Sequence, residues 1–246
     1  LKTYMLKAVR EAKTRISWTD ADEQYEQAVQ AFVQGTLLPE KESHFLPDIA
    51  RLTALTASAA FRISLARLAI QCTAPGIPDF YQGNELWDFS MVDPDNRRPV
   101  DFAQRRTLLE ALDAGTLQSA LHPDRLFEPR VNLPLGATLL RFRRAHAALL
   151  LDGRYQPLHS DAGTFAFVRT ARRERCITIA RTRFRDDTSN AESSVTIPAD
   201  LAGTWTSVLT GRAVTVGEVG QNVHSPLSDL MEPGRPCELL LDTGTG

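Results

Sequence analysis

The richest group of chemically active side chains in this sequence lies between residues 75 and 101. Carboxylates, arginines, asparagines, a glutamine, a tyrosine and a tryptophan all occur within this short stretch. Carboxylate acceptors and forked guanidinium donors bind hydroxyl groups, and an aromatic ring packs against the apolar face of a sugar. These residue types predict a pocket for a neutral ligand with many hydroxyls, such as a carbohydrate. They are equally typical of an ordinary loop that is braced by ion pairs between arginine and aspartate.

The carboxylates of this stretch do not form a metal-binding pattern. Asp93 and Asp95 match the start of an EF-hand calcium loop, but Arg98 stands where such a loop needs its glycine. The 5 histidines and 3 cysteines are scattered along the chain, and none forms a Cys-x-x-Cys pair. The sequence therefore predicts no metal site and no bound cofactor, and its cysteine usage favours a reducing compartment.

The overall charge is close to neutral, with 28 lysines and arginines against 30 aspartates and glutamates in 246 residues. No field of one sign is available to attract a nucleic acid or an anionic membrane. The apolar runs are interrupted by residues such as Arg67 and His146, and the N-terminus has no signal-peptide pattern. We therefore expect a cytoplasmic protein with no nucleic-acid or membrane partner.

Several segments that must position the chemically active stretch show the helical spacing of apolar residues. The spacing predicts one helix over residues 1–13, a second over 21–34 and a long third helix that begins near Pro47. Further along the chain, helices are expected over residues 107–114 and 131–150.

A short apolar run over residues 68–74 lies directly before the chemically active stretch. Pro75-Gly76-Ile77-Pro78 follows it, which no helix tolerates, so we predict a strand that is buried on both faces. Such a strand after a long helix suits a parallel sheet, in which functional loops follow the carboxyl ends of the strands.

Beyond residue 150 the pattern changes to short β-prone runs between turn signals. This spacing predicts a small antiparallel sandwich, so we expect two domains, residues 1–150 and 151–246. Loops are expected over residues 183–193 and 217–236. The predicted strands are Thr164–Thr170, Cys176–Thr182, Ser194–Ile197, Trp205–Thr210, Ala213–Val216 and Cys237–Leu241.

Two strings in the first 101 residues resemble known enzyme motifs. Pro75 to Glu85 reads Pro-Gly-x-Pro-x-x-Tyr-x-Gly-x-Glu. That pattern is similar to the eighth-strand region of the α-amylase superfamily of (β/α)8-barrel glycoside hydrolases (glycoside hydrolase family 13). The string from Trp87 to Asp101, together with Lys13-x-x-Ile16-Ser17-Trp18-Thr19, resembles the malto-oligosyltrehalose synthase family.

The resemblance covers nearly the whole chain and implies a fold of the α/β plus β class. Residues 1–150 would form the C-terminal part of a (β/α)8 catalytic barrel, with its last strand near residues 68–74. Residues 151–246 would form a small antiparallel β-sandwich domain.

The resemblance also implies a reaction on a malto-oligosaccharide substrate. The terminal α-1,4 bond at the reducing end is converted into an α,α-1,1 bond, which leaves a trehalose unit. This is the reaction of a (1->4)-alpha-D-glucan 1-alpha-D-glucosylmutase, an isomerisation without net hydrolysis. Retaining enzymes of this class use a nucleophilic carboxylate and an acid/base carboxylate. The released glucose must be held and water excluded. The implied pathway partner is malto-oligosyltrehalose trehalohydrolase.

The residues implied to line the reducing-end pocket fall into three groups along the chain. The first group follows the expected last strand; within it, Glu85 has the alternative role of holding the loop by accepting backbone N–H bonds. The charged residues of the second group, 93–98, contact sugar or brace the loop as an ion network. Lys13 and Trp18 have two alternative roles. They either reach the substrate site or are ordinary core or surface residues. The predicted substrate-binding residues are Tyr81, Gln82, Glu85, Trp87, Asp88, Asp93, Asp95, Asn96, Arg97, Arg98, Lys13 and Trp18.

Two motifs that the superfamily uses for catalysis do not occur in this sequence. One is Gly-x-Arg-x-Asp, which carries the nucleophile, and the other is a His-Asp pair that carries a further catalytic aspartate. The chain also opens at Leu1, without an initiator methionine and inside a helical pattern. We therefore expect a C-terminal fragment that is inactive alone, with its catalytic carboxylates on a missing N-terminal barrel portion.

Two other functions stay open at this stage. One is a fragment of an amylase-like glucan hydrolase or glucosyltransferase that uses the same barrel. The other is a noncatalytic glucan-binding module, in which the β domain is the functional part.

Overall fold

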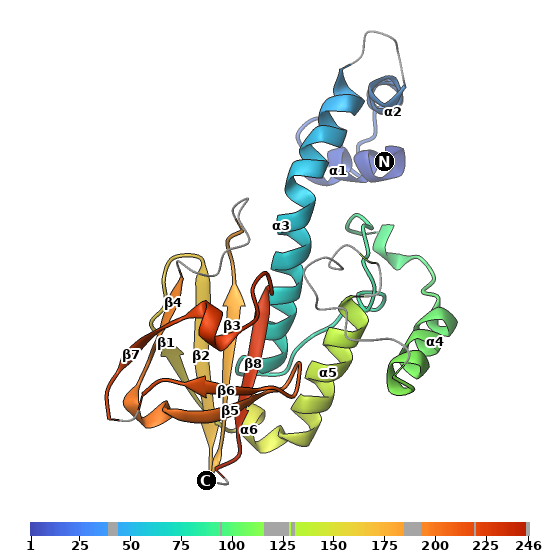
Figure 1. Ribbon diagram of the computed structural model, residues 1–246. Helices are drawn as coiled ribbons and strands as arrows, with labels where there is room; N and C mark the ends of the chain where they lie inside the picture. Colours follow the sequence, from blue (N-terminus) through green and yellow to red (C-terminus); the bar gives the residue numbers. More distant parts are fainter. Residues whose placement is uncertain are drawn as a thin grey trace. The chain divides into compact units, whose positions relative to one another are not determined.

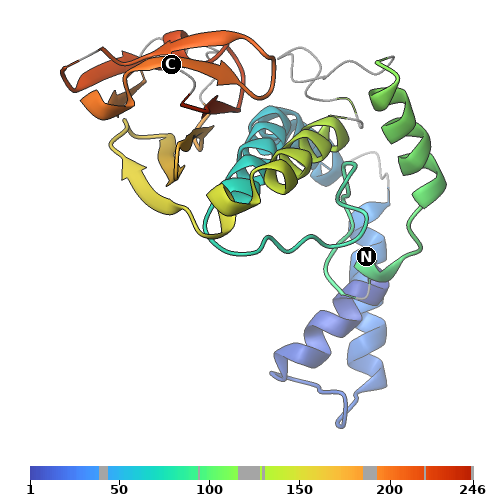
Figure 2. The same cartoon turned by 90° about the horizontal axis from the view of Figure 1, so that it is seen from below.

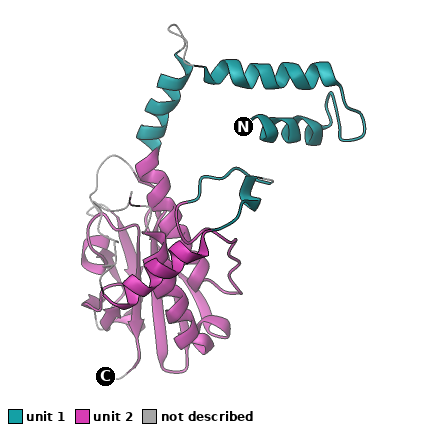
Figure 3. Cartoon of the chain, turned by 90° about the vertical axis from the view of Figure 1, so that its right-hand side faces the viewer, with its two compact units in different colours: residues 1–56, 88–100 teal, residues 57–87, 101–246 magenta. Residues whose placement is uncertain are grey.

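The chain combines helices with two antiparallel sheets (Figure 1). This computed structural model describes residues 1–38, 44–93, 95–115, 128, 131–184, 193–218 and 220–244. Its contacts define two compact units, unit 1 with Leu1–Thr56 and Asp88–Val100, and unit 2 with Ala57–Trp87 and Asp101–Gly246 (Figure 3). The antiparallel strands and most of the helices expected from the sequence are confirmed, and the helix expected over residues 107–114 begins earlier, at Phe102. The domain boundary expected near residue 150 stays a prediction.

Unit 1 is built on helices α1 (Lys2–Ala12) and α2 (Glu23–Leu37) and contains the start of α3 (Phe45–Thr73). The three helices predicted in this part of the sequence are confirmed. The Asp22 side chain caps α2, because it accepts a hydrogen bond of 3.0 Å from the Tyr25 backbone N–H.

A bidentate ion pair ties α1 to α2. Arg10 Nε and Nη2 donate to the two carboxylate oxygens of Glu26, each at 2.7 Å. These hydrogen bonds lower the pKa of the Glu26 carboxyl and raise the pKa of the Arg10 guanidinium. Paired forks of this kind fix the orientation of both side chains.

The strand predicted over residues 68–74 is wrong, because α3 runs without interruption to Thr73. Leu65, Ala69 and Cys72 are fully or almost fully buried and recur at helical spacing, so this apolar run continues the buried face of the helix. A short apolar run fits a buried strand and a buried helical turn equally well. Pro75 therefore marks the end of a helix and not the end of a strand.

The described part of unit 2 has three further helices before its sheets, α4 (Phe102–Asp113), α5 (Asn132–Ala145) and α6 (Ala147–Leu151). The single helix predicted over residues 131–150 is wrong in one respect. His146, at φ −112 and ψ 43, leaves the helical region and separates α5 from α6.

Two antiparallel sheets complete unit 2. One has the strand order β1-β2-β3-β8-β5-β6, and the other pairs β4 with β7. All six predicted strands are present with small shifts at their ends, but β1 and β7 were not predicted. The loop expected over residues 217–236 contains β7 and α7, and most of the loop expected over 183–193 lies outside the described residues. The elements are β1 (Arg154–Leu158), β2 (Thr164–Ala171), β3 (Glu174–Arg181), β4 (Ser194–Ile197), η3 (Ala199–Leu201), β5 (Gly203–Ser207), β6 (Ala213–Val216), β7 (Val223–Pro226), α7 (Leu227–Leu230) and β8 (Cys237–Asp242).

Both faces of the six-stranded sheet are covered, which explains its nearly continuous apolar runs. On one face, Cys176 and Leu239 pack with side chains from α5 and from the unit 2 part of α3. These two helical segments lie side by side in Figures 1 and 2. On the other face, Ile177 and Leu240 pack with side chains from β4 and α7. Successive residues on β3 and β8 thus point to opposite faces of the sheet and pack into two different hydrophobic cores.

The three cysteines are buried free thiols in the core that α3 and α5 share with the sheet. Burial raises the pKa of the Cys72 thiol to about 11 and that of Cys176 to about 12. Burial also raises the pKa of Cys237. These thiols are therefore protonated packing groups at neutral pH.

By length and composition alone, α3 is the one helix among the described residues that reaches the size of a membrane span. One such helix is weak support for a membrane, because core helices of soluble proteins meet the same measure. The C-terminal turns of α3 supply buried residues to the core of unit 2.

A pH-dependent stability is expected from Glu238, a carboxylate that is only 1% exposed. Its Oε1 accepts hydrogen bonds of 2.9 Å from Ser207 Oγ and from the Leu239 N–H, yet burial raises the pKa of the carboxyl. Between the usual and the raised pKa, the unfolded chain is ionised while the folded chain keeps its proton. Stability therefore falls as the pH rises through this window and stays lower above it.

Glu238→Gln removes this ionisation. We expect the melting temperature of the variant, relative to the natural chain, to increase as the pH rises from the usual titration range of a glutamate through the raised pKa of Glu238. Thermal melts followed by circular dichroism at several pH values test this. Glu110→Gln, at an exposed position on α4, is the control and should show a constant difference. A Glu238→Gln difference that is the same at every pH would contradict the expectation.

Candidate functional site

The predicted substrate-binding residues fall in both units. Unit 2 carries Tyr81, Gln82, Glu85 and Trp87 on the segment that follows α3. Unit 1 carries the others, on the loop of residues 88–98 and near the end of α1. The structure therefore defines the surroundings of each group within its own unit, and the role of each residue in binding stays a prediction.

In unit 1, the loop of residues 88–98 and the start of α1 line a pocket of about 760 Å³, here called the loop pocket. Asp88, Asp95 and Arg98 line it together with the aromatic rings of Tyr4 and Phe89. Its volume lies within the range of roughly 300–1,000 Å³ that is typical of small-molecule sites. Three of the predicted residues, Asp88, Asp95 and Arg98, therefore lie around one pocket, whereas its aromatic rings, Tyr4 and Phe89, were not among the predicted residues.

Internal hydrogen bonds hold the acidic side chains of the loop pocket. Asp88 Oδ1 accepts from the Ser90 N–H at 2.8 Å and from Ser90 Oγ at 2.6 Å. Asp95 accepts a 2.8 Å hydrogen bond from the Met91 N–H and forms an ion pair with Arg98. These contacts fix the loop and orient both carboxylates.

Asp93 is the centre of a small ion network in the same loop. It pairs with Lys7 Nζ of α1 at 3.1 Å and with Arg97. The bracing network considered for residues 93–98 is therefore formed at Asp93. Asn96 differs, because its Oδ1 is buried and has no hydrogen-bond partner among the described residues.

Lys13 and Trp18 both lie at the surface of unit 1. Lys13 ends α1 in the left-handed region, at φ 53, and its side chain is exposed. The Trp18 indole is 56% exposed, and the Arg10 guanidinium carbon lies 5.0 Å from its ring centroid. Neither residue has the buried position of a core side chain.

In unit 2, Glu85 is held by Arg105, and no backbone N–H of the described residues donates to its carboxylate. Arg105 Nε donates to Glu85 Oε2 at 2.8 Å, and its Nη2 donates to the Gly83 carbonyl at 2.7 Å. A third bond of 3.0 Å joins Nη1 to the carbonyl of Asp101, the residue that caps α4. One guanidinium therefore joins the 83–85 turn to the first turn of α4.

Loss of this guanidinium is expected to destabilise unit 2 measurably. Arg105→Gln removes an ion pair and two hydrogen bonds at a part-buried position, so we expect unfolding to become easier by about 2 kcal/mol. Urea unfolding followed by tryptophan fluorescence measures the change, since Trp87 lies two residues after Glu85. The matched control is Arg106→Gln, at the exposed neighbouring position, with an effect below about 0.5 kcal/mol. Equal effects of the two substitutions would contradict the role of Arg105.

The remaining predicted residues of unit 2 have different surroundings. Tyr81 is 46% exposed and lines a pocket of about 480 Å³ between α4, α5 and the end of α3. Gln82 is exposed. The ring of Trp87 packs against Phe61, at a centroid distance of 4.7 Å, and its Nε1–H donates to the Glu128 carbonyl at 2.9 Å. Trp87 is therefore held by two contacts, a ring packing and a hydrogen bond from its indole nitrogen.

Sequence reasoning missed two cations that organise these segments, Lys7 and Arg105. Lys7 lies 86 residues before its partner Asp93, and no local pattern links them. Arg105 lies 20 residues after Glu85, and its one sequence signal is its position four residues after the helix cap Asp101.

Within the part of the chain that the structure describes, no group of three His, Cys, Asp or Glu side chains could hold a metal ion. The described residues instead offer carboxylates, guanidinium groups and exposed aromatic rings. Such a set can orient a polyhydroxylated ligand by hydrogen bonding and stacking.

No protein-family model matches this chain. Two curated proteins, both described as "Putative maltooligosyl trehalose synthase", come from Mycobacterium tuberculosis strains CDC 1551 / Oshkosh and ATCC 25618 / H37Rv. Each is 35% identical to the chain over 211 residues, which is 86% of the chain and 25% of the relative. The chain therefore spans about a quarter of the length of these curated relatives.

Solved structures give the same result for the fold. The maltooligosyltrehalose synthase from Arthrobacter ramosus superposes with a TM-score of 0.73 and 29% identity, covering 97% of this chain and 29% of that chain. A second maltooligosyl trehalose synthase has a TM-score of 0.72 and 26% identity, covering 98% of this chain and 30% of that one.

Sequence and fold together relate the chain to a class of enzymes named for the synthesis of a trehalose sugar. The particular family is the maltooligosyl trehalose synthases, to which the chain is related over about a quarter of their length.

Proposed function

We propose that this chain is part of an enzyme that converts the reducing end of a malto-oligosaccharide into a trehalose unit. The observation that carries the proposal is the 35% identity, over 86% of the chain, to proteins described as maltooligosyl trehalose synthases. The near-neutral charge and the loop pocket suit an uncharged glucan.

The reaction is an intramolecular transglucosylation without net hydrolysis. One catalytic carboxylate attacks the anomeric carbon of the penultimate glucose residue and forms a glycosyl-enzyme intermediate, while the second protonates the leaving oxygen of the terminal glucose, so that the α-1,4 bond breaks. The released glucose turns and attacks the glycosyl-enzyme through its anomeric hydroxyl, which gives its proton back to the second carboxylate and frees the first. Asp88, Asp95 and Arg98 are proposed to hold this glucose from the wall of the loop pocket. Holding the glucose and excluding water are what separate transfer from hydrolysis.

The catalytic carboxylates are proposed to lie outside this chain, on an N-terminal barrel portion. The sequence has no Gly-x-Arg-x-Asp motif, and the relatives are about four times as long as the matched region. Exposed apolar side chains in unit 1, such as Phe32 at 72% and Leu55 at 73%, offer a surface for such a partner. In this proposal the chain is the end of a (β/α)8 barrel followed by a β-sandwich, located in the cytoplasm, and a malto-oligosyltrehalose trehalohydrolase consumes its product.

Incubation of the full-length protein with maltopentaose tests the reaction. Reducing ends should disappear while the number of glucose residues per product molecule stays constant. The 246-residue chain alone should give no conversion. Release of glucose or of shorter reducing sugars by the full-length protein would identify a hydrolase instead. Conversion by the chain alone would contradict the placement of the catalytic carboxylates.

A further inference from the structure

Unit 1 has a second, smaller pocket beside α1, here called the α1 pocket. It has a volume of about 280 Å³, and its lining includes Lys7, Arg10, Glu11, Trp18 and Asp93. This volume lies near the lower end of the roughly 300–1,000 Å³ range of small-molecule sites. The α1 pocket therefore suits one small ring and not an extended chain.

The Trp18 indole forms an open but fixed wall of the α1 pocket. The Arg10 guanidinium carbon is 5.0 Å from the ring centroid, and Arg10 itself is locked to Glu26 by two hydrogen bonds of 2.7 Å. The indole nevertheless keeps 56% of its surface exposed. A large ring that is already oriented loses little conformational entropy on binding, and the part of Trp18 that Arg10 does not cover remains available for contact.

The charged groups of the α1 pocket balance, with the basic Lys7 and Arg10 against the acidic Glu11 and Asp93. An anion or a cation would therefore gain little electrostatic attraction from this lining. The hydroxyl groups of a neutral ligand can accept hydrogen bonds from the basic groups and donate to the acidic ones.

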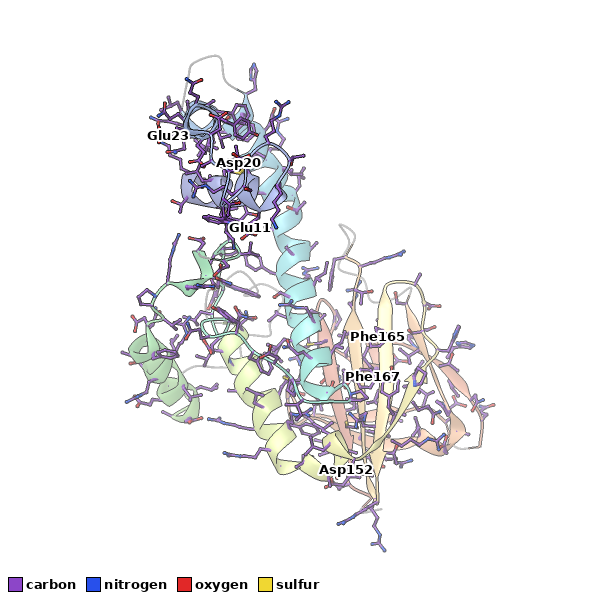
Figure 4. All side chains as sticks on the ribbon, turned by 180° about the vertical axis from the view of Figure 1, so that it is seen from behind. Glu11, Asp20, Glu23, Asp152, Phe165 and Phe167 are labelled. Carbon is purple, nitrogen blue, oxygen red and sulfur yellow. The ribbon has the colours of Figure 1, made fainter. Side chains whose placement is uncertain are left out.

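Glu11 is the acceptor of the α1 pocket that is least engaged by the protein. Asp93 already pairs with Lys7 at 3.1 Å and with Arg97. The Glu11 side chain is 55% exposed, and Lys7 Nζ lies 4.0 Å from its Oε1, beyond hydrogen-bond distance. Figure 4 labels Glu11 on unit 1, where its side chain extends from α1.

We propose that the α1 pocket binds one glucose residue of an α-glucan, with Trp18 beneath the sugar ring and Glu11 accepting hydrogen bonds from its hydroxyls. The proposal rests on the proposed function for the class of ligand. It adds Glu11 as a binding residue and gives Trp18 the specific role of a stacking platform.

Titration of the 246-residue chain with maltopentaose, followed by calorimetry and tryptophan fluorescence, tests this proposal. Trp18→Ala should weaken binding at least about tenfold, since truncation of a central aromatic contact typically costs more than 1 kcal/mol. Trp18→Phe keeps a ring and should weaken binding by less than about threefold. Glu11→Gln should weaken it by roughly three- to tenfold, because a charge-assisted hydrogen bond becomes a neutral one.

Matched controls separate binding from folding. Phe32→Ala removes another exposed aromatic ring of unit 1, and Glu23→Gln removes another exposed carboxylate, which Figure 4 also labels. Both should bind maltopentaose like the natural chain. If Trp18→Ala fails to fold, the Trp18→Phe and Glu11→Gln titrations still decide the question.

Unchanged affinity in Trp18→Ala and Glu11→Gln would overturn the α1 pocket and leave the proposed function standing. No binding of maltopentaose by the natural chain would also overturn the pocket. The proposed function is judged separately, by the products of the full-length protein, so the two failures are distinguishable.

Discussion

Replacing Arg169 by methionine is expected to lower the melting temperature of unit 2 by about 10 °C. Arg169 lies on β2, is 1% exposed, and faces the helices of unit 2. Its guanidinium donates to the carbonyls of Thr73 at 2.9 Å, Leu150 at 3.0 Å and Gly153 at 2.9 Å. The ends of α3 and α6 therefore meet at one cation, where the negative ends of two helix dipoles favour a positive charge.

The loss of stability in Arg169→Met arises from the buried carbonyls that lose their hydrogen-bond donor. Burial lowers the pKa of the Arg169 guanidinium, but arginine stays protonated in proteins, so the natural chain buries a charge whose two terminal nitrogens donate to three carbonyls. Methionine of similar length would leave three carbonyls without their donor, at about 1–3 kcal/mol for each buried group that finds no water. Thermal melts followed by circular dichroism measure the effect.

Two further variants show whether burial is the cause. Arg141→Met also removes a guanidinium, but from a surface ion pair with Asp113 at 2.7 Å, so a change below about 1 kcal/mol is expected. Arg169→Lys keeps the charge but has fewer donors, and it should melt between Arg169→Met and the natural chain. Similar melting temperatures for Arg169→Met and Arg141→Met would contradict this account.

The sequence predicted those elements whose pattern of apolar residues fits only one kind of secondary structure. Helices α1 and α2 have one apolar face each, and β3 and β8 have runs that only a two-sided core explains. The run at residues 68–74 has no such unique meaning, because a turn of helix buried by α5 and the sheet is as apolar as a strand. β7 was missed for another reason. It has four residues, ends in Pro226 and pairs with β4 in a two-stranded sheet, so most of its signal resembles a loop.

Three of the predicted substrate-binding residues line the loop pocket, and the sequence did not indicate what holds them. Asp88, Asp95 and Arg98 are close in sequence and line one pocket, as expected for a short loop. Their supports come from distant positions, since Lys7 reaches Asp93 from α1. Long-range ion pairs leave no local pattern in a single sequence. Glu11 was missed because one acidic residue on a helix is normally a solvated surface group.

A methyl group at Gly153 is expected to destabilise unit 2 by about 3 kcal/mol or to prevent its folding. An added Cβ would lie 2.0 Å from the Leu149 carbonyl oxygen and 3.2 Å from the Thr170 carbonyl oxygen. Both obstacles are backbone atoms, so no side chain can rotate away to make room. The glycine is required here for space, at the point where α6 ends and β1 begins.

Gly136→Ala is the matched control, because the same methyl group meets only Leu68 Cδ2, at the ordinary contact distance of 3.9 Å. Gly136 lies within α5, where alanine favours the helix by about 1 kcal/mol, so this variant should be as stable as the natural chain or more stable. Chemical unfolding of both variants provides the comparison, with soluble yield as the readout if Gly153→Ala does not fold. A Gly153→Ala chain as stable as Gly136→Ala would show that the backbone at the end of α6 can move aside.

The two substitutions at this junction should also be coupled. The Gly153 carbonyl is one of the three that Arg169 binds, so a backbone shift forced by Gly153→Ala would already weaken that bond. The destabilisation by the double variant Gly153→Ala/Arg169→Met should therefore be smaller than the sum of the two single effects. Strict additivity would mean that the crowded turn and the buried cation stabilise unit 2 independently.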